Sequence, residues 1–336
     1  MKVLTKSKPR VLLINPTIHI DGVKILEQEA EIVYAPDGSP KTLKEYLSQG
    51  IKGVILRTEV MTKDLIMEAS DLRVIGVNGV GYSNVDVDAA TAKGVVVVNA
   101  VGANKHSVAE HIVMFALAMA RDLKRADEAV RSGFWAYRDT YPLHEIRGKT
   151  FFSVGFGNIG REACRVMSLA FDMEILVYDP FVEKKEIERY GYRKVERFED
   201  GAKNADFISL HLPHTKETSE MINKETIKAI KPGCKFINCA RGQIVDYDAL
   251  CDALESGQID MAGIDVFPVE PAPKDHRLFT LDNVLATPHC AGDTVEARRR
   301  IAISVANDVL AVLRGEQPRC FVNKDLATKI TDLFRK

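Results

Sequence analysis

The chain has 336 residues, which is long enough for two domains that each bury a sizeable core. Hydrophobic residues make up 46% of the sequence and charged residues 28%, as in an ordinary globular protein, and the formal net charge is −1. Because the chain has no excess of positive charge to attract nucleic acid or a membrane surface, we expect neither as a partner.

The sequence shows no sign of a membrane span or a secretion signal. No apolar run reaches transmembrane length, and residues 1–6 lack the apolar stretch of a signal peptide. The six cysteines have no Cys-x-x-Cys spacing, so we expect reduced thiols and no bound metal. Together these features predict a cytoplasmic enzyme.

The N-terminal third alternates short apolar runs with helix-like segments. Residues 11–14 predict a strand, residues 22–28 a helix and residues 31–34 a second strand. Further apolar runs follow at residues 53–56, 74–77 and 95–98. Continuous apolar runs separated by helices are typical of a parallel sheet that is covered on both faces. We therefore expect a small α/β unit here.

A long helical pattern follows from Ser107 to Arg121. Ser107 and Glu110, three residues apart, match the pattern of a capping box. The aromatic stretch after this helix, residues 133–142, holds the only tryptophan, Trp135. Aromatic residues are enriched in protein interfaces, so we expect this stretch to pack against the other subunit of a homodimer.

A glycine-rich turn opens the second half of the chain. Residues 154–160 read Val-Gly-Phe-Gly-Asn-Ile-Gly and lie between an apolar run and a helix-like run. In a strand–turn–helix of this kind, Gly155 allows a tight turn, Gly157 lets the backbone approach a pyrophosphate, and Gly160 lets helix and strand pack closely. The pattern predicts a dinucleotide-binding site, and the alternative is a glycine-rich turn without a ligand.

Asp179 strengthens the dinucleotide interpretation. It ends a second apolar run nineteen residues after Gly160, where a carboxylate can accept hydrogen bonds from the ribose hydroxyls. Its negative charge would repel a 2′-phosphate, and residues 180–183 contain no arginine to bind that phosphate. The sequence therefore favours NAD over NADP.

Polar residues follow the later apolar runs, which predict further strands. These runs are residues 207–210, 235–238, 262–264 and 284–286. Ligands bind beyond the carboxyl ends of the strands in an open parallel sheet, so the residues at these ends are the candidate site.

Arg241, Glu270 and His289 are the candidate catalytic residues, because each lies at or just past a predicted strand end. An arginine fork binds the carboxylate of a 2-keto acid, and a histidine titrates in the range that suits a proton donor. A carboxylate beside the histidine favours the charged ring and orients it. Each residue alone has an ordinary alternative on the surface or in a loop; their joint placement favours catalysis.

With these motifs the chain resembles the NAD-dependent D-2-hydroxyacid dehydrogenases. Within that family it looks most like the 3-phosphoglycerate dehydrogenases. The resemblance rests on residues 78–86, 107–111, 154–160, 209–213, 238–242, 265–271 and 287–289. It implies an α/β fold of two Rossmann-like domains with the active site in the cleft between them. The flavodoxin-like substrate domain would comprise residues 1–103 and 306–336, and the NAD-binding Rossmann domain residues 104–305.

The resemblance also implies roles for single residues. Arg241 would bind and polarise the substrate, His289 would be the acid/base, and Glu270 would pair with His289. The NAD contacts would be Gly155, Gly157, Asn158, Ile159, Gly160, Asp179, Leu212, Pro213, Thr218, Cys239, Ala240 and Asp265, with Asp265 on the nicotinamide carboxamide.

The substrate contacts implied by the resemblance are Arg57, Asn78, Val80 and Gly81. The backbone around Val80 and Gly81 would hold the substrate carboxylate. Asn78 stands where phosphoglycerate-specific members usually carry arginine, so Arg57 and Lys105 are the candidates for a phosphate-binding charge. The alternative for each is a solvated surface residue.

The predicted activity is hydride transfer between NAD and a D-2-hydroxy acid or its 2-keto acid. The resemblance favours 3-phosphoglycerate as the substrate, with a glyoxylate or hydroxypyruvate reductase as the alternative. A rival from another class is a non-catalytic, NADH-sensing scaffold that resembles the C-terminal-binding corepressors.

Overall fold

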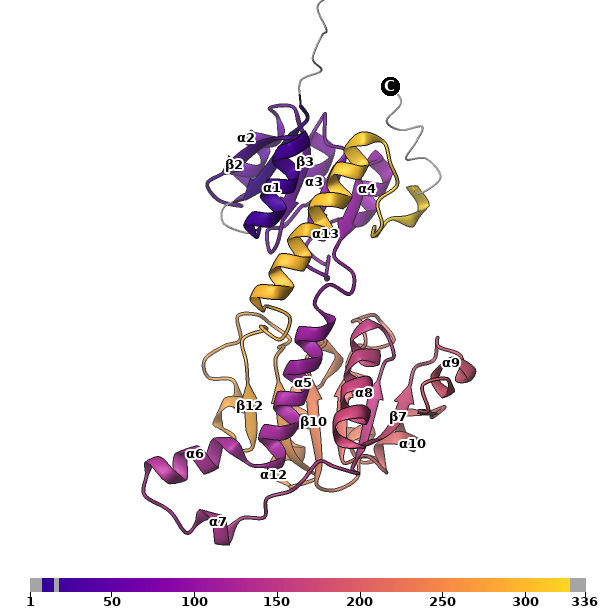
Figure 1. Cartoon of the computed structure of the whole chain (residues 1–336). Coiled ribbons are helices and arrows are strands. Elements are labelled where there is room, and N and C mark those ends of the chain that lie inside the picture. Colours follow the sequence, from indigo (N-terminus) through magenta and orange to yellow (C-terminus); the bar gives the residue numbers. More distant parts are fainter. Residues whose placement is uncertain (1–7, 15–17, 327–336) are drawn as a thin grey trace, which may run out of the picture. The chain divides into compact units, whose positions relative to one another are not determined.

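A computed structural model describes residues 8–14 and 18–326, and the chain forms two compact α/β units (Figure 1). The first unit comprises Met1–Asn104 and Asp293–Lys336, and the second comprises Lys105–Gly292. The sequence places the second boundary later, at residue 306, and the ends of its first domain, residues 1–7 and 327–336, lie outside the described residues. The difference arises because the helix that begins at residue 295 packs on the first unit.

The first unit is built on a parallel sheet of five strands in the order β2-β1-β3-β4-β5. The strands are β1 (Arg10–Ile14), β2 (Glu31–Ala35), β3 (Ile51–Leu56), β4 (Val74–Val77) and β5 (Val96–Asn99). The helices are α1 (Ile20–Glu29), α2 (Pro40–Leu47), α3 (Lys63–Glu68), α4 (Val87–Lys93) and α13 (Val295–Arg314), with a short 3₁₀ turn η3 (Lys324–Leu326). This is the flavodoxin-like strand order.

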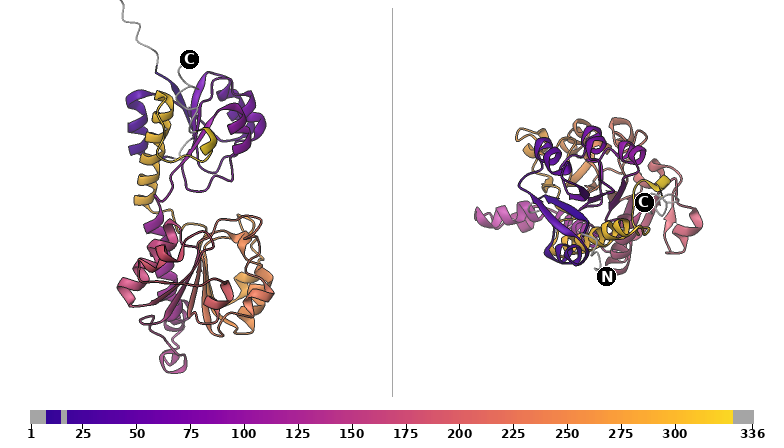
Figure 2. Two further views of the ribbon diagram at one scale, coloured as in Figure 1. Left: turned by 90° about the vertical axis from the view of Figure 1, so that its right-hand side faces the viewer. Right: turned by 90° about the horizontal axis from the view of Figure 1, so that it is seen from above.

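Helices cover both faces of this sheet, as the continuous apolar strands predict (Figure 2). Val11 and Leu13 of β1 pack with residues of α1 and α13, whereas Leu12 and Ile14 pack with residues of α2, α3 and α4. The alternation follows from the two-residue repeat of a strand. Gly76 in β4 lets α13 approach closely, because a Cβ there would lie 2.8 Å from a methyl carbon of Val305.

The second unit has a seven-stranded parallel sheet in the order β12-β11-β10-β9-β6-β7-β8. The strands are β6 (Thr150–Val154), β7 (Glu174–Tyr178), β8 (Arg193–Lys194), β9 (Phe207–Leu210), β10 (Cys234–Asn238), β11 (Ile259–Ile264) and β12 (Val284–Ala286). The chain builds β6, β7 and β8 outward in one direction, and then starts again at β9 on the other side of β6. This is the doubly wound Rossmann order, and the point between β6 and β9 is its topological switch. The predicted fold class is confirmed.

Helices flank the second sheet. They are α5 (Lys105–Ala120), α6 (Leu123–Arg131), α7 (Tyr137–Thr140), α8 (Asn158–Phe171), α9 (Lys184–Glu188), α10 (Phe198–Ala202), α11 (Lys224–Ile227) and α12 (Tyr247–Glu255), with 3₁₀ turns η1 (Gly242–Ile244) and η2 (Arg277–Thr280). Ser107 lies inside α5, after its start at Lys105, so Ser107 is not the N-cap that the capping-box pattern predicts. None of the helices in the described parts of the chain is long and apolar enough to cross a membrane.

Candidate active site

The glycine turn joins β6 to α8 at the topological switch. Gly155 has φ +105°, and a Cβ there would lie 3.0 Å from the carbonyl carbon and oxygen of His211. A Cβ on Gly160 would lie 2.4 Å from the carbonyl oxygen of Gly155, so only glycine lets the helix start this close to the strand. The corresponding position at Gly157 faces open space. Each of the three glycines therefore meets the requirement that the fingerprint places on it.

Asp179 is bound to this turn. It follows β7 and is 8% exposed; its Oδ2 accepts a hydrogen bond of 2.8 Å from the Phe156 amide and its Oδ1 one of 2.9 Å from the Phe181 amide. A carboxylate oxygen has two lone pairs, so each oxygen keeps one for a further donor. The local geometry thus fits a group that orients the turn and can accept a hydrogen bond from a ribose hydroxyl.

The other predicted NAD residues follow strands of the same sheet. Leu212, Pro213 and Thr218 lie in the loop after β9, where the Thr218 hydroxyl donates a 2.7 Å hydrogen bond to the Pro213 carbonyl. A Leu212 methyl lies 3.1 Å from the position of a Cβ at Gly155, so this loop borders the glycine turn. Cys239 and Ala240 directly follow β10, beside β9. The structure therefore gathers these residues at one sheet edge.

His289 and Glu270 are in direct contact. His289 Nδ1 lies 2.6 Å from Glu270 Oε2, while Glu270 Oε1 accepts a hydrogen bond of 2.9 Å from the Phe267 amide. Because a carboxylate only accepts, the ring carries its proton on Nδ1, and Nε2 is the nitrogen left for another partner. His289 has φ +51°, an uncommon conformation for a residue with a side chain and one that recurs at functional sites.

Arg241 lies in the segment that packs against the Glu270 loop. Burial lowers the pKa of the Arg241 guanidinium, and the charge of Glu270 opposes that shift. Asn238 holds the turn at both ends, since its Nδ2 donates to the Arg241 carbonyl and its Oδ1 accepts from the Ala240 amide. A Cβ on Gly242 would lie 2.0 Å from the carbonyl carbon of Phe267, so the two segments meet only because residue 242 is glycine. The structure thus joins His289 to Glu270 and packs the segment of Arg241 against the Glu270 loop.

Asp265 holds the loop that carries His289, a role that the sequence did not reveal. Its side chain is 1% exposed, and its carboxylate accepts hydrogen bonds from the Thr287 hydroxyl at 2.6 Å and from the amides of Cys290 and Ala291, both at 2.9 Å. The Asp265 carbonyl also accepts from the His289 amide at 2.8 Å. The carboxamide contact implied for Asp265 stays a proposal.

His111 is a further part of this arrangement that sequence reasoning missed. It lies on α5, and its Nε2 is 3.0 Å from the Thr287 hydroxyl oxygen, which itself donates to Asp265. Burial lowers the pKa of His111, and the charge of Asp265 opposes that shift. The motif at residues 107–111 is visible in the sequence, but its partner Thr287 is 176 residues away, so only the fold reveals the contact.

The predicted substrate residues are grouped in the first unit. Arg57 and Asn78 directly follow β3 and β4, which pair side by side, and the Asn78 amide donates a 2.7 Å hydrogen bond to the Leu56 carbonyl. Asn99 Nδ2 donates to the Val80 carbonyl at 2.7 Å and fixes the turn that contains Gly81. These four residues share the carboxyl edge of the five-stranded sheet.

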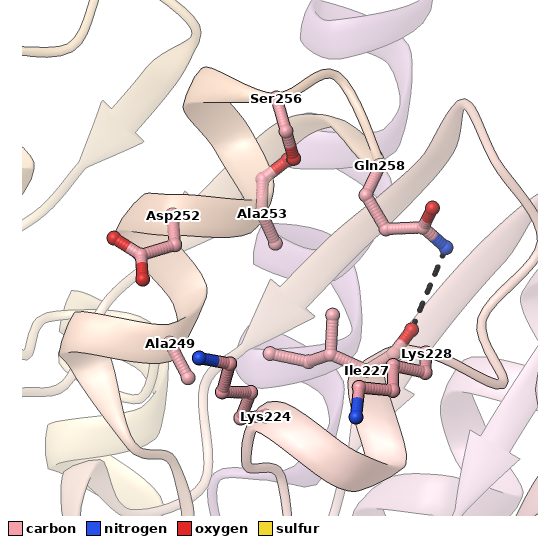
Figure 3. Close-up of a pocket in the computed structure, with 8 residues that line it drawn as sticks. All are labelled: Lys224, Ile227, Lys228, Ala249, Asp252, Ala253, Ser256 and Gln258. Atoms are coloured by element: carbon pink, nitrogen blue, oxygen red, sulfur yellow. Dashed lines mark hydrogen bonds between the residues drawn. The ribbon is translucent and has the colours of Figure 1, made fainter.

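The surface pocket in Figure 3 lies apart from the predicted site residues, and the described residues form no metal cluster. Within residues 8–14 and 18–326, no group of three or more His, Cys, Asp or Glu side chains is placed to hold a metal. The pocket lies between α11 and α12 and is lined by residues such as Lys224, Asp252 and Gln258 (Figure 3). It contains no residue predicted for the cofactor, the substrate or catalysis.

Comparison with known proteins identifies the family. Residues 113–291 match the NAD binding domain of the D-isomer specific 2-hydroxyacid dehydrogenases. Glyoxylate reductase from Thermococcus litoralis is 38% identical over 330 residues, which cover 96% of this chain and 98% of that protein. The chain belongs to the D-isomer specific 2-hydroxyacid dehydrogenase family. The resemblance seen in the sequence is confirmed, and the second unit is the family's NAD-binding domain.

Other members of the family are similar in sequence or structure. D-3-phosphoglycerate dehydrogenase from Methanocaldococcus jannaschii is 39% identical over 312 residues, which are 93% of this chain and 59% of that protein. D-mandelate dehydrogenase from Rhodotorula graminis has a solved structure with a TM-score of 0.87 and 26% identity, covering 95% of this chain and 99% of that one. The chain spans little more than half the length of the curated D-3-phosphoglycerate dehydrogenases that it matches.

We expect His211 to make the protein less stable in mild acid. Both ring nitrogens are buried and have no hydrogen-bond partner among the residues that the structure describes. Burial lowers the pKa of His211 from 6.5 to about 3. Below pH 6.5 the unfolded chain binds a proton that the folded chain does not, so the free energy of unfolding should fall as the pH drops from 6.5 towards 3. The loss attributable to His211 should reach about 2 kcal/mol at pH 5.

Urea unfolding of the wild type and of His211→Gln at pH 7.5 and pH 5 measures this contribution. The variant should lose less stability on acidification than the wild type. His214→Gln, at an exposed histidine of the same loop, is the matched control and should behave as the wild type does. Equal acid sensitivity in the wild type and His211→Gln would contradict the expectation.

Proposed function

We propose that this protein is an NAD-dependent dehydrogenase that interconverts a D-2-hydroxy acid and its 2-keto acid. The observation that carries the proposal is the 2.6 Å contact between His289 and Glu270, in the unit that contains the glycine turn and the half-buried Arg241. These are the groups that reduction of a carbonyl next to a carboxylate requires: a cation, a proton donor and a support for that donor.

In this mechanism the protein binds and orients the substrate and moves one proton. The Arg241 guanidinium binds the substrate carboxylate and polarises its carbonyl. His289 is protonated on both nitrogens, with Nδ1–H directed to Glu270, and it donates the Nε2 proton to the carbonyl oxygen. The cofactor would supply the redox chemistry: NADH would give a hydride in reduction, and NAD⁺ would accept one in oxidation. In oxidation, neutral His289 takes the hydroxyl proton.

The residues of the second unit fit this cofactor. Gly157 leaves open space at the start of α8, where backbone N–H groups and the positive end of the helix dipole favour a pyrophosphate. Asp179 has lone pairs for the ribose hydroxyls. We propose Arg57, Asn78, Val80 and Gly81 of the first unit as substrate contacts.

The names of the relatives suggest two substrates. D-3-phosphoglycerate is the first candidate because several similar proteins are D-3-phosphoglycerate dehydrogenases; glyoxylate or hydroxypyruvate is the second because a glyoxylate reductase matches along its whole length. The test is NADH oxidation with glyoxylate, hydroxypyruvate, pyruvate and 3-phosphohydroxypyruvate. Turnover of any of these supports the proposal. NADH binding without turnover of any of them would instead indicate the sensing scaffold.

The cofactor preference gives the next prediction. Asp179→Ala should weaken NADH binding by about 1–3 kcal/mol, because a charge-assisted hydrogen bond to the ribose is lost. Fluorescence titration of the wild type and the variant with NADH and NADPH measures both affinities. The wild type should bind NADH more tightly, and this preference should shrink in the variant. A wild-type preference for NADPH would refute the role of Asp179.

The proton donor can be tested by substitution. His289→Ala should lower kcat about 10²–10⁴-fold and leave the Kd for NADH nearly unchanged, since the proton donor is lost but the nucleotide contacts remain. Stopped-flow reduction with a saturating keto acid measures the step. Glu270→Gln keeps the His289 ring in place but no longer favours its charged form, so it should lose less than His289→Ala. Near-normal kcat in His289→Ala would refute the assignment.

We also propose that the protein is a cytoplasmic homodimer that assembles through the segment of α6 and α7. Figure 1 shows this segment extending from the rest of the second unit. It exposes large apolar side chains, with Leu123 59%, Val130 60% and Trp135 66% exposed. At its base the Tyr137 hydroxyl donates a 2.6 Å hydrogen bond to Asp122, which ties α7 to the start of α6. Exposed apolar clusters of this kind mark protein interfaces.

Light scattering after size-exclusion chromatography tests the dimer. The wild type should have the mass of two chains. Val130→Asp should lower the measured mass towards that of one chain, because it places a charge in the apolar contact. Tyr34→Asp, at a half-exposed residue of β2, is the matched control and should leave the mass unchanged. A monomeric wild type, or a fully dimeric Val130→Asp, would contradict the proposed interface.

A further inference from the structure

Two arginines share one carboxylate beside the proposed substrate residues of the first unit. Asp293 Oδ1 accepts hydrogen bonds from Arg57 Nη2 at 2.8 Å and from Arg298 Nε at 2.7 Å, and Arg298 also bonds Asp293 Oδ2. The Asp293 side chain is only 22% exposed. The hydrogen bond from Arg298, followed by that from Arg57, keeps the pKa of the Asp293 carboxyl below its usual value. Asp293 is therefore ionised at neutral pH.

The position of Arg57 is set by its own turn. Glu59 Oε2 accepts a hydrogen bond of 2.7 Å from the Arg57 amide, and Asn84 Nδ2 donates to the carbonyls of Arg57 and Glu59 at 3.2 and 2.8 Å. Arg57 and Asn78 follow directly after Leu56 and Val77, which are paired across β3 and β4. The guanidinium of Arg57 thus belongs to the same sheet edge as Asn78.

The formal charges of the cluster around Asp293 cancel. The positive charges of Arg57 and Arg298 are balanced by the carboxylates of Asp293 and Glu59, both bonded to this cluster. A phosphate group carries a charge of about −1.5 to −2 at neutral pH. It would have to compete with Asp293 for both guanidinium groups, whereas a hydroxyl or hydrogen at the same place on the substrate would not.

We propose that Asp293 is a specificity-determining residue: by holding Arg57 and Arg298, it lowers the selectivity of the enzyme for a 2-keto acid that carries a distal phosphate. Small unphosphorylated 2-keto acids are then accepted alongside the phosphorylated one. This inference rests on the proposed dehydrogenase function and refines it, since it names the residue that sets the balance between the two candidate substrates. It also explains how a chain with arginine at residue 57 need not be restricted to phosphorylated substrates.

The test compares two substrates that differ only in the phosphoryl group. The ratio of kcat/KM for 3-phosphohydroxypyruvate to that for hydroxypyruvate is measured for the wild type and Asp293→Asn. The variant keeps the size of the side chain and one acceptor oxygen but removes its charge. The ratio should rise roughly tenfold at low ionic strength, and the rise should shrink with added salt because the effect is electrostatic.

Two further variants separate specificity from stability. Asp21→Asn is the matched control, because Asp21 of α1 forms a similar ion pair with Arg299, the neighbour of Arg298 on α13. It should leave the ratio unchanged. Arg57→Gln and Arg298→Gln added to Asp293→Asn should abolish the rise in the ratio, because the two freed guanidinium groups are what attract the phosphate. A purely structural role of Asp293 would lower kcat/KM for both substrates by the same factor.

The outcomes distinguish this inference from the proposed function. An active Asp293→Asn enzyme whose ratio is unchanged or lower would overturn the role of Asp293 and leave the dehydrogenase assignment intact. A rise that survives in the triple variant would also overturn it, because neither guanidinium group would then be what attracts the phosphate. A wild type that binds NADH but reduces none of the four keto acids would refute the dehydrogenase function, and the inference with it. A wild type that reduces only glyoxylate or pyruvate would keep the dehydrogenase function and overturn the inference.

Discussion

The buried carboxylate of Asp265 is the interaction on which the proposed catalytic arrangement depends. Its two oxygens accept three hydrogen bonds from the loop after β12, and its carbonyl accepts a fourth from His289 itself. A buried charge is tolerated only when such donors replace water. The same bonds hold His289 in its uncommon backbone conformation, with Nδ1 against Glu270. His111 completes the network from α5 through Thr287.

Close backbone packing provides the second constraint. At Gly160 and Gly242 any side chain would overlap a neighbouring carbonyl group, so both contacts exist only with glycine. The first brings α8 against the glycine turn, and the second brings the Arg241 segment against the Glu270 loop. Hydrogen bonds from the residue 242–247 segment, through Gln243 and Tyr247, then hold that loop. The proposed cofactor-binding and catalytic residues are therefore positioned by backbone contacts as much as by side chains.

The two units divide the chemistry between them. The second holds the nucleotide fingerprint, the proposed acid/base pair and Arg241, whereas the first gathers Arg57 with the backbone turn at Val80. Both use the carboxyl edge of a parallel sheet, where polar residues follow the buried strands. The first unit adds a charge cluster that contains residues from the two ends of the chain, Arg57 and Asp293. We propose that this cluster sets the selectivity for a charged group on the substrate without altering the proton donor.

The sequence by itself determined the fold class, the family and the candidate residues. Strand periodicity, the glycine turn and Asp179 are local patterns with local physical causes, so they can be read from neighbouring residues. Tertiary structure decided the rest, because the decisive partners are distant in sequence. Asp265 meets residues 287–291, His111 meets Thr287 across 176 positions, and Arg57 meets Asp293 across 236. The boundary at residue 293 likewise depends on the packing of α13 on the first sheet, which no local pattern encodes.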